Sequence, residues 1–123
     1  NYYATVKLEE PEKSFEIIKK NLSINKKITA IICSTEFSAL SAIKACNNLD
    51  LKIGKDISII TFDGSLVRDL STPPITAASF PVKELGRKAI NILLNKVSKP
   101  NKNSNFLAKT QIIERGSVHT VTN

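Results

Sequence analysis

An apolar, β-branched run ends abruptly on an aspartate and a glycine at residues 57–64, Ile-Ser-Ile-Ile-Thr-Phe-Asp-Gly. Such a run is typical of a buried parallel strand, because both faces of the strand are covered and no polar alternation is needed. In open α/β sheets, ligand-contacting groups lie at the carboxyl ends of the strands. Asp63 stands at that position and is therefore a candidate acceptor for a small molecule. Asp-Gly is also ordinary turn chemistry, and a simple cap after the strand is the competing interpretation.

The residue types needed for covalent or metal chemistry are few. His119 is the only histidine and lies near the end of the chain, so neither a Ser-His-Asp nor a Cys-His arrangement is indicated. Cys33 and Cys46 fall in a predicted strand and a predicted helix without a close metal-ligand spacing. We therefore expect two buried, reduced thiols, no metal, no cofactor and no enzyme activity.

The formal net charge is +7, but the lysines are spread along the chain in pairs and no aromatic residues interleave with them. This distribution is typical of solvated helix faces and does not indicate a nucleic-acid surface. No apolar run of 18 residues and no signal peptide is visible, so we expect a cytoplasmic protein without a membrane span. The sequence contains no methionine and opens on a strand-like segment, so we expect a fragment of a longer protein.

The order of predicted elements is that of a layered α/β protein. Strands are expected at residues 1–8, 28–33, 57–62 and 106–115, with an extended segment at 75–80, and helices at 11–22, 35–46 and 81–97, with a short helical turn at 65–70. Residues 116–123 are expected to be a frayed tail. Strands alternating with helices predict a three-layer fold, a parallel sheet with helices on both faces.

Five segments of the chain form a recognisable series, at residues 28–43, 54–64, 70–76, 81–86 and 112–117. In this order and spacing they resemble the effector-binding core of the lactose/galactose-repressor (LacI/GalR) family of bacterial transcription regulators. Sugar-binding receptors of transporters share the fold. The double proline Pro73-Pro74, the Pro-Val-x-x-Leu-Gly start at Pro81 and the Arg-Gly-Ser ending at Arg115 are more similar to the repressors.

The resemblance implies a periplasmic-binding-protein-like type I fold, with residues 1–123 forming an effector-binding fragment that is mainly the C-terminal lobe. Residues 76–98 would cross to an N-terminal lobe that this chain does not contain. DNA would be bound only through a helix-turn-helix domain that is also absent. Relatives dimerise through the region that matches Leu40, Val67 and Leu70, so the resemblance implies a homodimer.

The resemblance also implies a set of effector-binding residues. Asp63 matches an aspartate that accepts hydrogen bonds from effector hydroxyls or ring nitrogens. Thr35 replaces a common asparagine and would also suit a helix N-cap. Glu36 replaces an aspartate of the same motif and is either an effector contact or a residue that only favours the helix N-terminus electrostatically. Glu9 stands where several relatives have a stacking aromatic ring, which argues against a purine-like ligand. Phe80 replaces a frequent glutamine and is either an apolar wall or a core residue.

This set of carboxylate, hydroxyl and aromatic groups suits a polyol, so a small carbohydrate is the expected effector. A transport receptor for sugars is an alternative that the fold alone does not separate. A phosphoacceptor receiver domain is a second alternative, in which Glu9 and Glu10 would hold Mg²⁺ and Asp63 would take the phosphate. The double proline has no place in a receiver, and receivers carry aspartate in the acidic pair.

The helix predicted from Pro81 has more apolar residues than one stripe requires. The predicted helix contains one apolar group with further apolar residues beside it; the group is Val82, Leu85, Ala89, Ile92 and Leu93. We therefore expect this helix to contribute to self-association of the chain.

Overall fold

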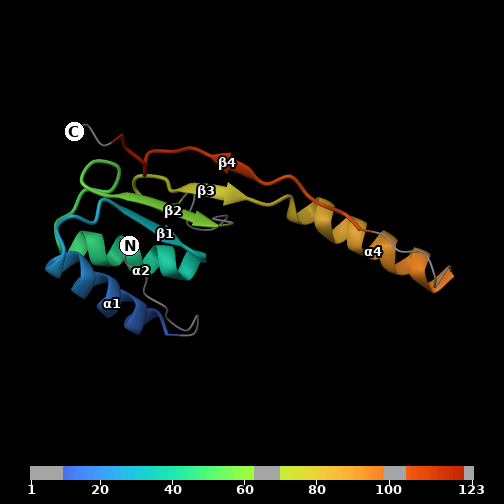
Figure 1. The fold of residues 1–123 in the computed structure, drawn as a ribbon, viewed down its shortest axis with the longest axis horizontal. Coiled ribbons are helices and arrows are strands. Elements are labelled where there is room, and N and C mark those ends of the chain that lie inside the picture. The colour runs from blue at the N-terminus through green and yellow to red at the C-terminus, as the bar shows by residue number, and fades with distance from the viewer. Residues whose placement is uncertain (1–9, 63–69, 99–104, 121–123) are drawn as a thin grey trace. The chain divides into compact units, whose positions relative to one another are not determined.

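The computed structural model describes residues 10–62, 70–98 and 105–120 of the chain (Figure 1). The chain divides into two compact units. Unit 1 contains Asn1–Ser79 and Ile112–Asn123, and unit 2 contains Phe80–Gln111. The predicted opening strand and almost all of the helical turn at 65–70 lie outside the described residues.

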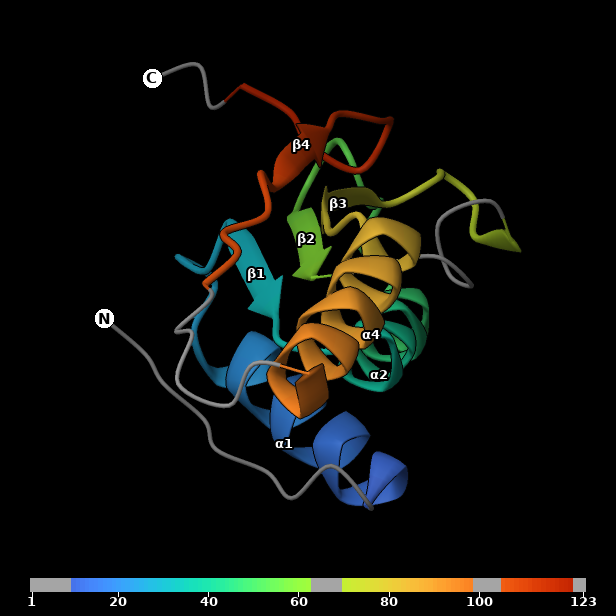
Figure 2. The same cartoon turned by 90° about the vertical axis from the view of Figure 1, so that its right-hand side faces the viewer.

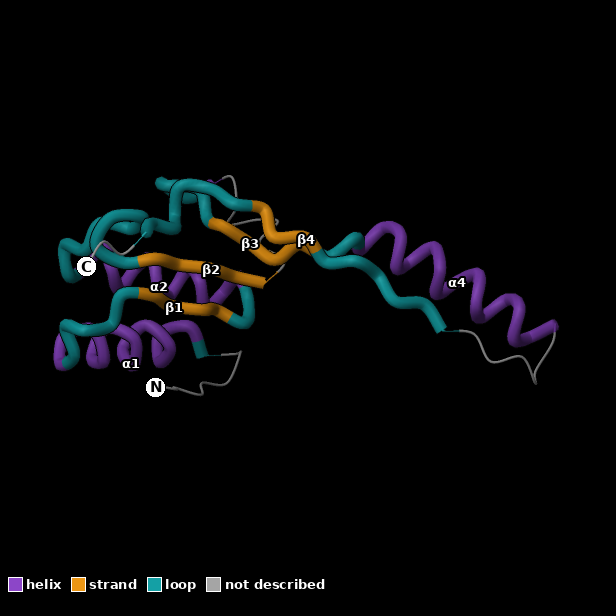
Figure 3. The backbone as a smooth tube through the Cα atoms, turned by 45° about the horizontal axis from the view of Figure 1, so that its top comes forward, coloured by secondary structure: helices purple, strands orange, loops and turns teal. Residues whose placement is uncertain are grey.

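Four strands form one sheet in the order β1-β2-β3-β4 (Figure 3). They are β1 (Ala30–Cys33), β2 (Ser58–Phe62), β3 (Thr76–Ser79) and β4 (Gln111–Ile113). β1, β2 and β3 pair in parallel, with Cys33 opposite Thr61 and Phe62 opposite Ala78. The predicted parallel pairing is thus confirmed, and β3 falls within the extended segment that the sequence predicted. β4 is shorter than the strand expected at residues 106–115.

Two helices complete unit 1, α1 (Pro11–Ile24) and α2 (Glu36–Asn48). Pro11 occupies the first turn of α1, as predicted, where its missing N–H leaves no helical hydrogen bond unmade. Thr35 caps α2, as predicted: its hydroxyl accepts from the Ser38 N–H at 3.2 Å, and the Ser38 hydroxyl accepts from the Thr35 N–H at 3.1 Å. This reciprocal pair satisfies two N–H groups that a helix start leaves free.

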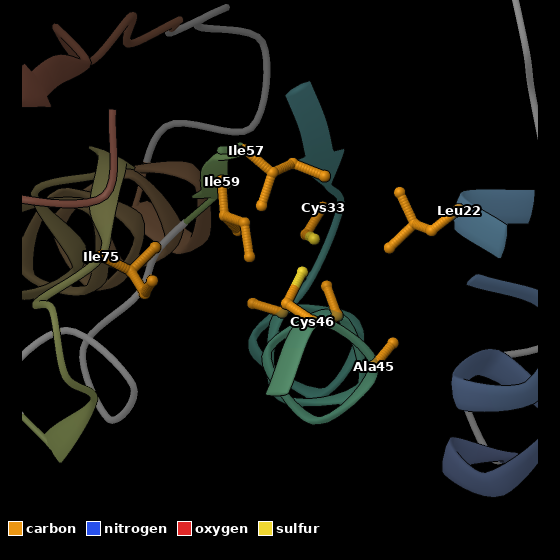
Figure 4. Close-up of a cluster of buried hydrophobic side chains, with 9 residues drawn as sticks. Leu22, Cys33, Ala45, Cys46, Ile57, Ile59 and Ile75 are labelled. Carbon is orange, nitrogen blue, oxygen red and sulfur yellow. The ribbon is translucent and has the colours of Figure 1, made fainter. Parts of the chain in front are cut away.

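The core of unit 1 lies between the sheet and these helices (Figure 4). α2 packs against β1 and β2, and α1 packs against α2, which Figure 2 shows in a view turned by 90°. The buried cluster contains small residues from α2 and larger ones from the strands and α1; it comprises Leu22, Cys33, Ala39, Ala42, Ala45, Cys46, Ile57, Ile59 and Ile75.

Both cysteines belong to this core and are free thiols, as the sequence predicted. Burial raises the pKa of the Cys33 thiol to about 12 and that of Cys46 to about 11. A thiol must lose its proton to act as a nucleophile, so both side chains are unreactive in the folded chain at neutral pH.

The described residues of unit 1 place helices on only one face of the sheet. Ile31 and Cys33 of β1 point toward α2, and alternation along the strand turns Ile32 the other way. Every residue of β1 is apolar, yet Ile32 is 74% exposed. Phe62, on the same face of β2, is 44% exposed. The second layer of helices that the sequence predicted is not formed by the described part of this unit.

The prediction of a frayed tail is wrong for residues 116–120. Ser117 is completely buried, and its hydroxyl donates to Ile59 O at 2.6 Å. His119 is half-buried, and its Nδ1 lies 3.0 Å from the Ser58 Oγ, which also accepts from the His119 N–H at 3.2 Å. The segment is held by side-chain hydrogen bonds to β2, which an apolar pattern does not reveal.

Unit 2 is built around α4 (Val82–Ser98), which matches the helix predicted from Pro81. None of its residues is buried in this chain, and its exposed apolar side chains include Val82, Ile90, Leu93, Leu94 and Val97. Within the unit, the Lys88 Nζ lies 5.4 Å from the centre of the Phe106 ring. No helix in the described ranges is long and apolar enough to cross a membrane.

The two sides of the sheet give a direct test of where the stability of unit 1 originates. Ile59→Ala removes a fully buried side chain and should lower the free energy of unfolding by about 2–4 kcal/mol. Ile32→Ala, its matched control on the open face, should change it by less than about 1 kcal/mol. Urea denaturation followed by circular dichroism measures both, and equal losses would contradict this assignment of the core.

The α2 cap gives a second test. Thr35→Ala should lower the free energy of unfolding by about 0.5–2 kcal/mol, because the Ser38 N–H loses its acceptor. Thr35→Ser keeps the hydroxyl and should retain most of the stability. The same denaturation measurement applies, and an equally large loss in both variants would assign the effect to the threonine methyl group instead.

Candidate functional site

The carboxyl edge of the parallel strands is the candidate site. Cys33, the last residue of β1, pairs with Thr61 of β2, so the segments that follow these two strands leave the sheet at the same edge. Thr35 follows β1 by two residues, and Asp63 follows Phe62, the last residue of β2, directly. The structure therefore brings Thr35 to the strand-end edge that the sequence predicted. Asp63 and Glu9 themselves lie outside the described residues.

The Thr35 hydroxyl is largely committed to the helix cap. The Ser38 hydroxyl donates to Thr35 O at 2.8 Å, which leaves the Thr35 hydroxyl as the donor in the 3.1 Å contact between the two side-chain oxygens. Thr35 Oγ1 also accepts from the Ser38 N–H. A hydroxyl has one hydrogen and two lone pairs, so one lone pair remains. Thr35, which is half-buried, can thus accept a hydrogen bond from a ligand hydroxyl without leaving its cap.

Glu36 is the first residue of α2 and is half-buried. A carboxylate at this position interacts favourably with the positive end of the helix dipole. This role needs no ligand, and it accounts for an acidic residue here. An effector contact by Glu36 stays a prediction.

Phe80 directly follows Ser79, the last residue of β3, and is the first residue of unit 2. Its side chain is 38% exposed in this chain. That exposure disagrees with the interpretation of Phe80 as a fully packed core residue. It leaves the alternative of an apolar wall, which is untested.

Phe62 is a further candidate for this edge that the sequence did not single out. It is the last residue of β2, directly before Asp63 in the sequence, and 44% of its side chain is exposed. Its place on the open face of β2 follows from the alternation of the strand. The sequence could have indicated this candidate, because an aromatic ring directly before a strand-ending aspartate can cover the apolar side of a ligand that the aspartate binds.

The predicted dimer residues are exposed where the structure describes them. Leu40 on α2 is 50% exposed and Leu70 is 85% exposed, whereas Val67 lies outside the described residues. Phe37 is a further exposed apolar residue of α2, three positions before Leu40 and therefore on the same side of the helix.

The described residues contain no cluster of histidine, cysteine, aspartate and glutamate that could hold a metal ion. The Ser58–His119 pair lies at the amino end of β2, at the opposite end of the strand from Phe62. Since Ser58 is buried and accepts from the His119 main chain as well, the pair fastens the chain rather than activating a nucleophile.

Comparisons with known proteins agree with this geometry. The family described as periplasmic binding protein-like domain matches residues 2–118. The transcriptional regulator MalR of Streptomyces coelicolor is 34% identical over 95 residues, which cover 76% of this chain and 28% of MalR. The repressor PurR of Histophilus somni is 33% identical over 113 residues, 91% of this chain and 34% of PurR. The chain thus spans about a third of the length of these relatives.

Solved structures show the same fold. A LacI family transcriptional regulator from Bifidobacterium animalis has a TM-score of 0.81 at 30% identity, over 91% of this chain and 41% of that chain. A LacI family regulator from Arthrobacter in complex with lactose has a TM-score of 0.78 at 21% identity, over 89% and 42%. These proteins are named as transcriptional regulators and not as enzymes. The chain therefore belongs to the periplasmic binding protein-like domain family, in the form found in LacI-type transcriptional regulators.

Proposed function

We propose that this chain is the ligand-sensing part of a LacI-type transcriptional regulator, and that it binds a small carbohydrate at the carboxyl edge of its parallel strands. Effector binding would alter DNA binding by a helix-turn-helix domain outside this sequence. The observation that supports the proposal is the parallel register of β1 and β2, because Cys33 and Thr61 lie side by side at the edge where both strands end. Thr35 follows the first of these strands, and in the sequence Asp63 follows the second.

The side chains of this edge favour a polyol over a flat heterocycle. Asp63 supplies a carboxylate acceptor, and Thr35 has one lone pair free for a donor, which suits the hydroxyl groups of a sugar. Phe62 exposes an aromatic ring that could cover the apolar face of a sugar. Glu9 stands where several relatives have a stacking ring, which argues against a purine-like ligand. The lactose complex of the Arthrobacter regulator supports the sugar class.

We also propose that the regulator is a cytoplasmic homodimer. Phe37, Leu40 and Leu70 expose apolar side chains in a part of the chain that corresponds to the dimer contact of relatives. Burying such side chains in a symmetric contact stabilises it by about 1.5–3 kcal/mol for each fully covered residue. The exposed face of α4 is a second candidate surface, as expected from the sequence.

Substitution of Asp63 tests the effector site. In the full-length regulator, Asp63→Asn should weaken sugar binding by about 2–3 kcal/mol, which is roughly 30- to 150-fold, because a charge-assisted hydrogen bond is lost. Isothermal titration calorimetry with a panel of mono- and disaccharides measures it. Asp50→Asn, at an exposed carboxylate in the turn after α2, is the control and should leave affinity unchanged. Unchanged affinity in a folded Asp63→Asn variant would exclude Asp63 from the site.

Sedimentation of the 123-residue chain tests the oligomer. Leu40→Lys should weaken self-association at least tenfold, whereas Ile24→Lys, at an exposed residue at the end of α1, should have little effect. Leu93→Lys tests the second candidate surface, the exposed face of α4. Dissociation by Leu93→Lys alone would assign the contact to α4, and a wild-type chain that stays monomeric at micromolar concentration would refute both surfaces.

A further inference from the structure

Four hydrogen bonds join Thr35 and Ser38 at the start of α2. The Thr35 N–H donates to the Ser38 Oγ at 3.1 Å, and the Ser38 N–H donates to the Thr35 Oγ1 at 3.2 Å. The Ser38 hydroxyl donates to the Thr35 carbonyl oxygen at 2.8 Å, and the two side-chain oxygens lie 3.1 Å apart. A capping box usually has glutamate or glutamine at the position of Ser38. The serine brings a hydroxyl of its own into contact with the threonine hydroxyl.

The donation by Ser38 determines where the Thr35 hydroxyl hydrogen points. Ser38 has one hydroxyl hydrogen, and the carbonyl oxygen is the nearer of its two possible acceptors on Thr35, at 2.8 Å against 3.1 Å. The contact between the two hydroxyl oxygens then needs the Thr35 hydrogen, because two oxygens at this distance repel each other without a hydrogen between them. The Ser38 hydroxyl thus uses its hydrogen and both lone pairs on Thr35.

This arrangement leaves the Thr35 hydroxyl as an acceptor only. One lone pair accepts from the Ser38 N–H, the hydrogen is donated to the Ser38 Oγ, and the second lone pair is available to a ligand. Turning the hydrogen toward a ligand would break the bond between the two hydroxyls and leave Ser38 with an unused lone pair. A ligand group that faces Thr35 must therefore bring its own hydrogen.

The same cap reduces the capacity of this helix start to bind an anion. Free N–H groups at a helix N-terminus ordinarily suit a phosphate or a carboxylate. Here the N–H groups of Thr35 and Ser38 are already bonded to side-chain oxygens. Glu36 adds an acidic residue in the first turn, which opposes a second negative charge. The start of α2 therefore suits a neutral or positively charged donor better than an anion.

We infer that Ser38 is a positioning residue that sets the hydrogen-bond selectivity of the candidate site. It acts through Thr35, by holding the threonine hydrogen away from the ligand. The group of the effector that faces Thr35 is then a hydroxyl or an amine, and an ether, carbonyl or phosphate oxygen in its place is disfavoured. The inference rests on the proposed carbohydrate function and adds which kind of group the edge near α2 selects. An asparagine at this position carries both an acceptor and donors and would not make this selection.

Fluorinated sugars test the inference, because fluorine is close in size to a hydroxyl group but cannot donate a hydrogen bond. Isothermal titration calorimetry of the full-length regulator compares D-glucose, D-galactose and lactose with their single deoxyfluoro derivatives. In the wild-type regulator, fluorine at the sugar position that faces Thr35 should weaken binding about tenfold, since it meets a lone pair. That position is identified as the one at which the fluorine effect is lost in Thr35→Ala.

Ser38→Ala removes the acceptor of the Thr35 hydrogen and should reduce the loss at the same sugar position to about threefold or less. Ser38→Thr keeps the hydroxyl and is the matched control, in which the tenfold loss should remain. Each comparison is between two sugars on one variant, so a general loss of stability would weaken both alike and leave their affinity ratio unchanged. In a Thr35→Ala background, Ser38→Ala should no longer alter the ratio, because Ser38 acts through Thr35.

Thr35→Asn keeps the test decisive if Ser38→Ala does not fold. Asparagine is at least as good an N-cap as threonine, and its amide adds N–H donors that threonine does not have. The fluorine effect at the same sugar position should again fall to about threefold or less.

Two results would overturn the inference. One is an unchanged affinity ratio in a folded Ser38→Ala variant, and the other is tighter binding of the fluorinated sugar than of its parent by the wild-type regulator. Both leave the proposed function intact, because the parent sugars still bind. Absence of binding by these sugars and by the wider panel of mono- and disaccharides would instead refute the proposed function, and this inference with it.

Discussion

The close packing of α2 on the sheet is the contact that positions the other parts of unit 1. Its buried residues are all small, Ala39, Ser41, Ala42, Ala45 and Cys46, so the helix axis can approach β1 and β2 closely. The Ser41 hydroxyl donates to Pro11 O at 3.1 Å, which ties the start of α1 to the same helix. A larger side chain on this face would push α2 away from the strands and displace the cap at Thr35 with it.

That packing connects the core to the candidate site. The N-terminus of α2 begins directly after β1, so the position of Thr35 is determined by how the helix sits on the sheet. The capping pair with Ser38 then orients the threonine hydroxyl and leaves it one lone pair. In the proposed site, the oxygen that caps the helix would also be the one that meets the ligand. A substitution at Thr35 that changed the ligand preference would also have to satisfy the helix end.

The elements that could be predicted are those with local signals. Pro11 marked a helix start, Thr35 marked another, and the run Ile57–Phe62 identified a parallel strand, because each depends on neighbouring residues. The error at residues 116–120 has the opposite origin. Ser117 is buried by hydrogen bonds to Ile59 and Thr76, which are far away in the sequence, and a polar segment gives no periodic sign of such bonds. The exposure of Phe62 was not predicted, because one side of β2 is open in the described part of unit 1. An apolar strand sequence does not show which of its sides is open.

The strand edge that carries the candidate site was predicted for the same reason, whereas the effector contacts themselves stay predictions. An aspartate directly after an apolar strand predicts, from the sequence, where the carboxyl end of that strand lies. The parallel register confirms that β1 and β2 end at the same edge. How much of each side chain remains available to a ligand depends on contacts between elements. For Thr35 and Phe62 this availability emerges only from the folded chain.

The distance in sequence between Ser117 and its partners Ile59 and Thr76 has a consequence for how the chain acquires its structure. Ser117 joins residues 58 and 41 positions before it, after the whole of unit 2 has been passed. Contacts that close such long loops form slowly and cost more chain entropy than the helices and the β1–β2 pair. On a ribosome, β2 and β3 would remain without this bridge until residue 117 had emerged. A chain cut short before Arg115 would contain every described helix and all four strands of the sheet, but it would lack Ser117, which bridges β2 and β3.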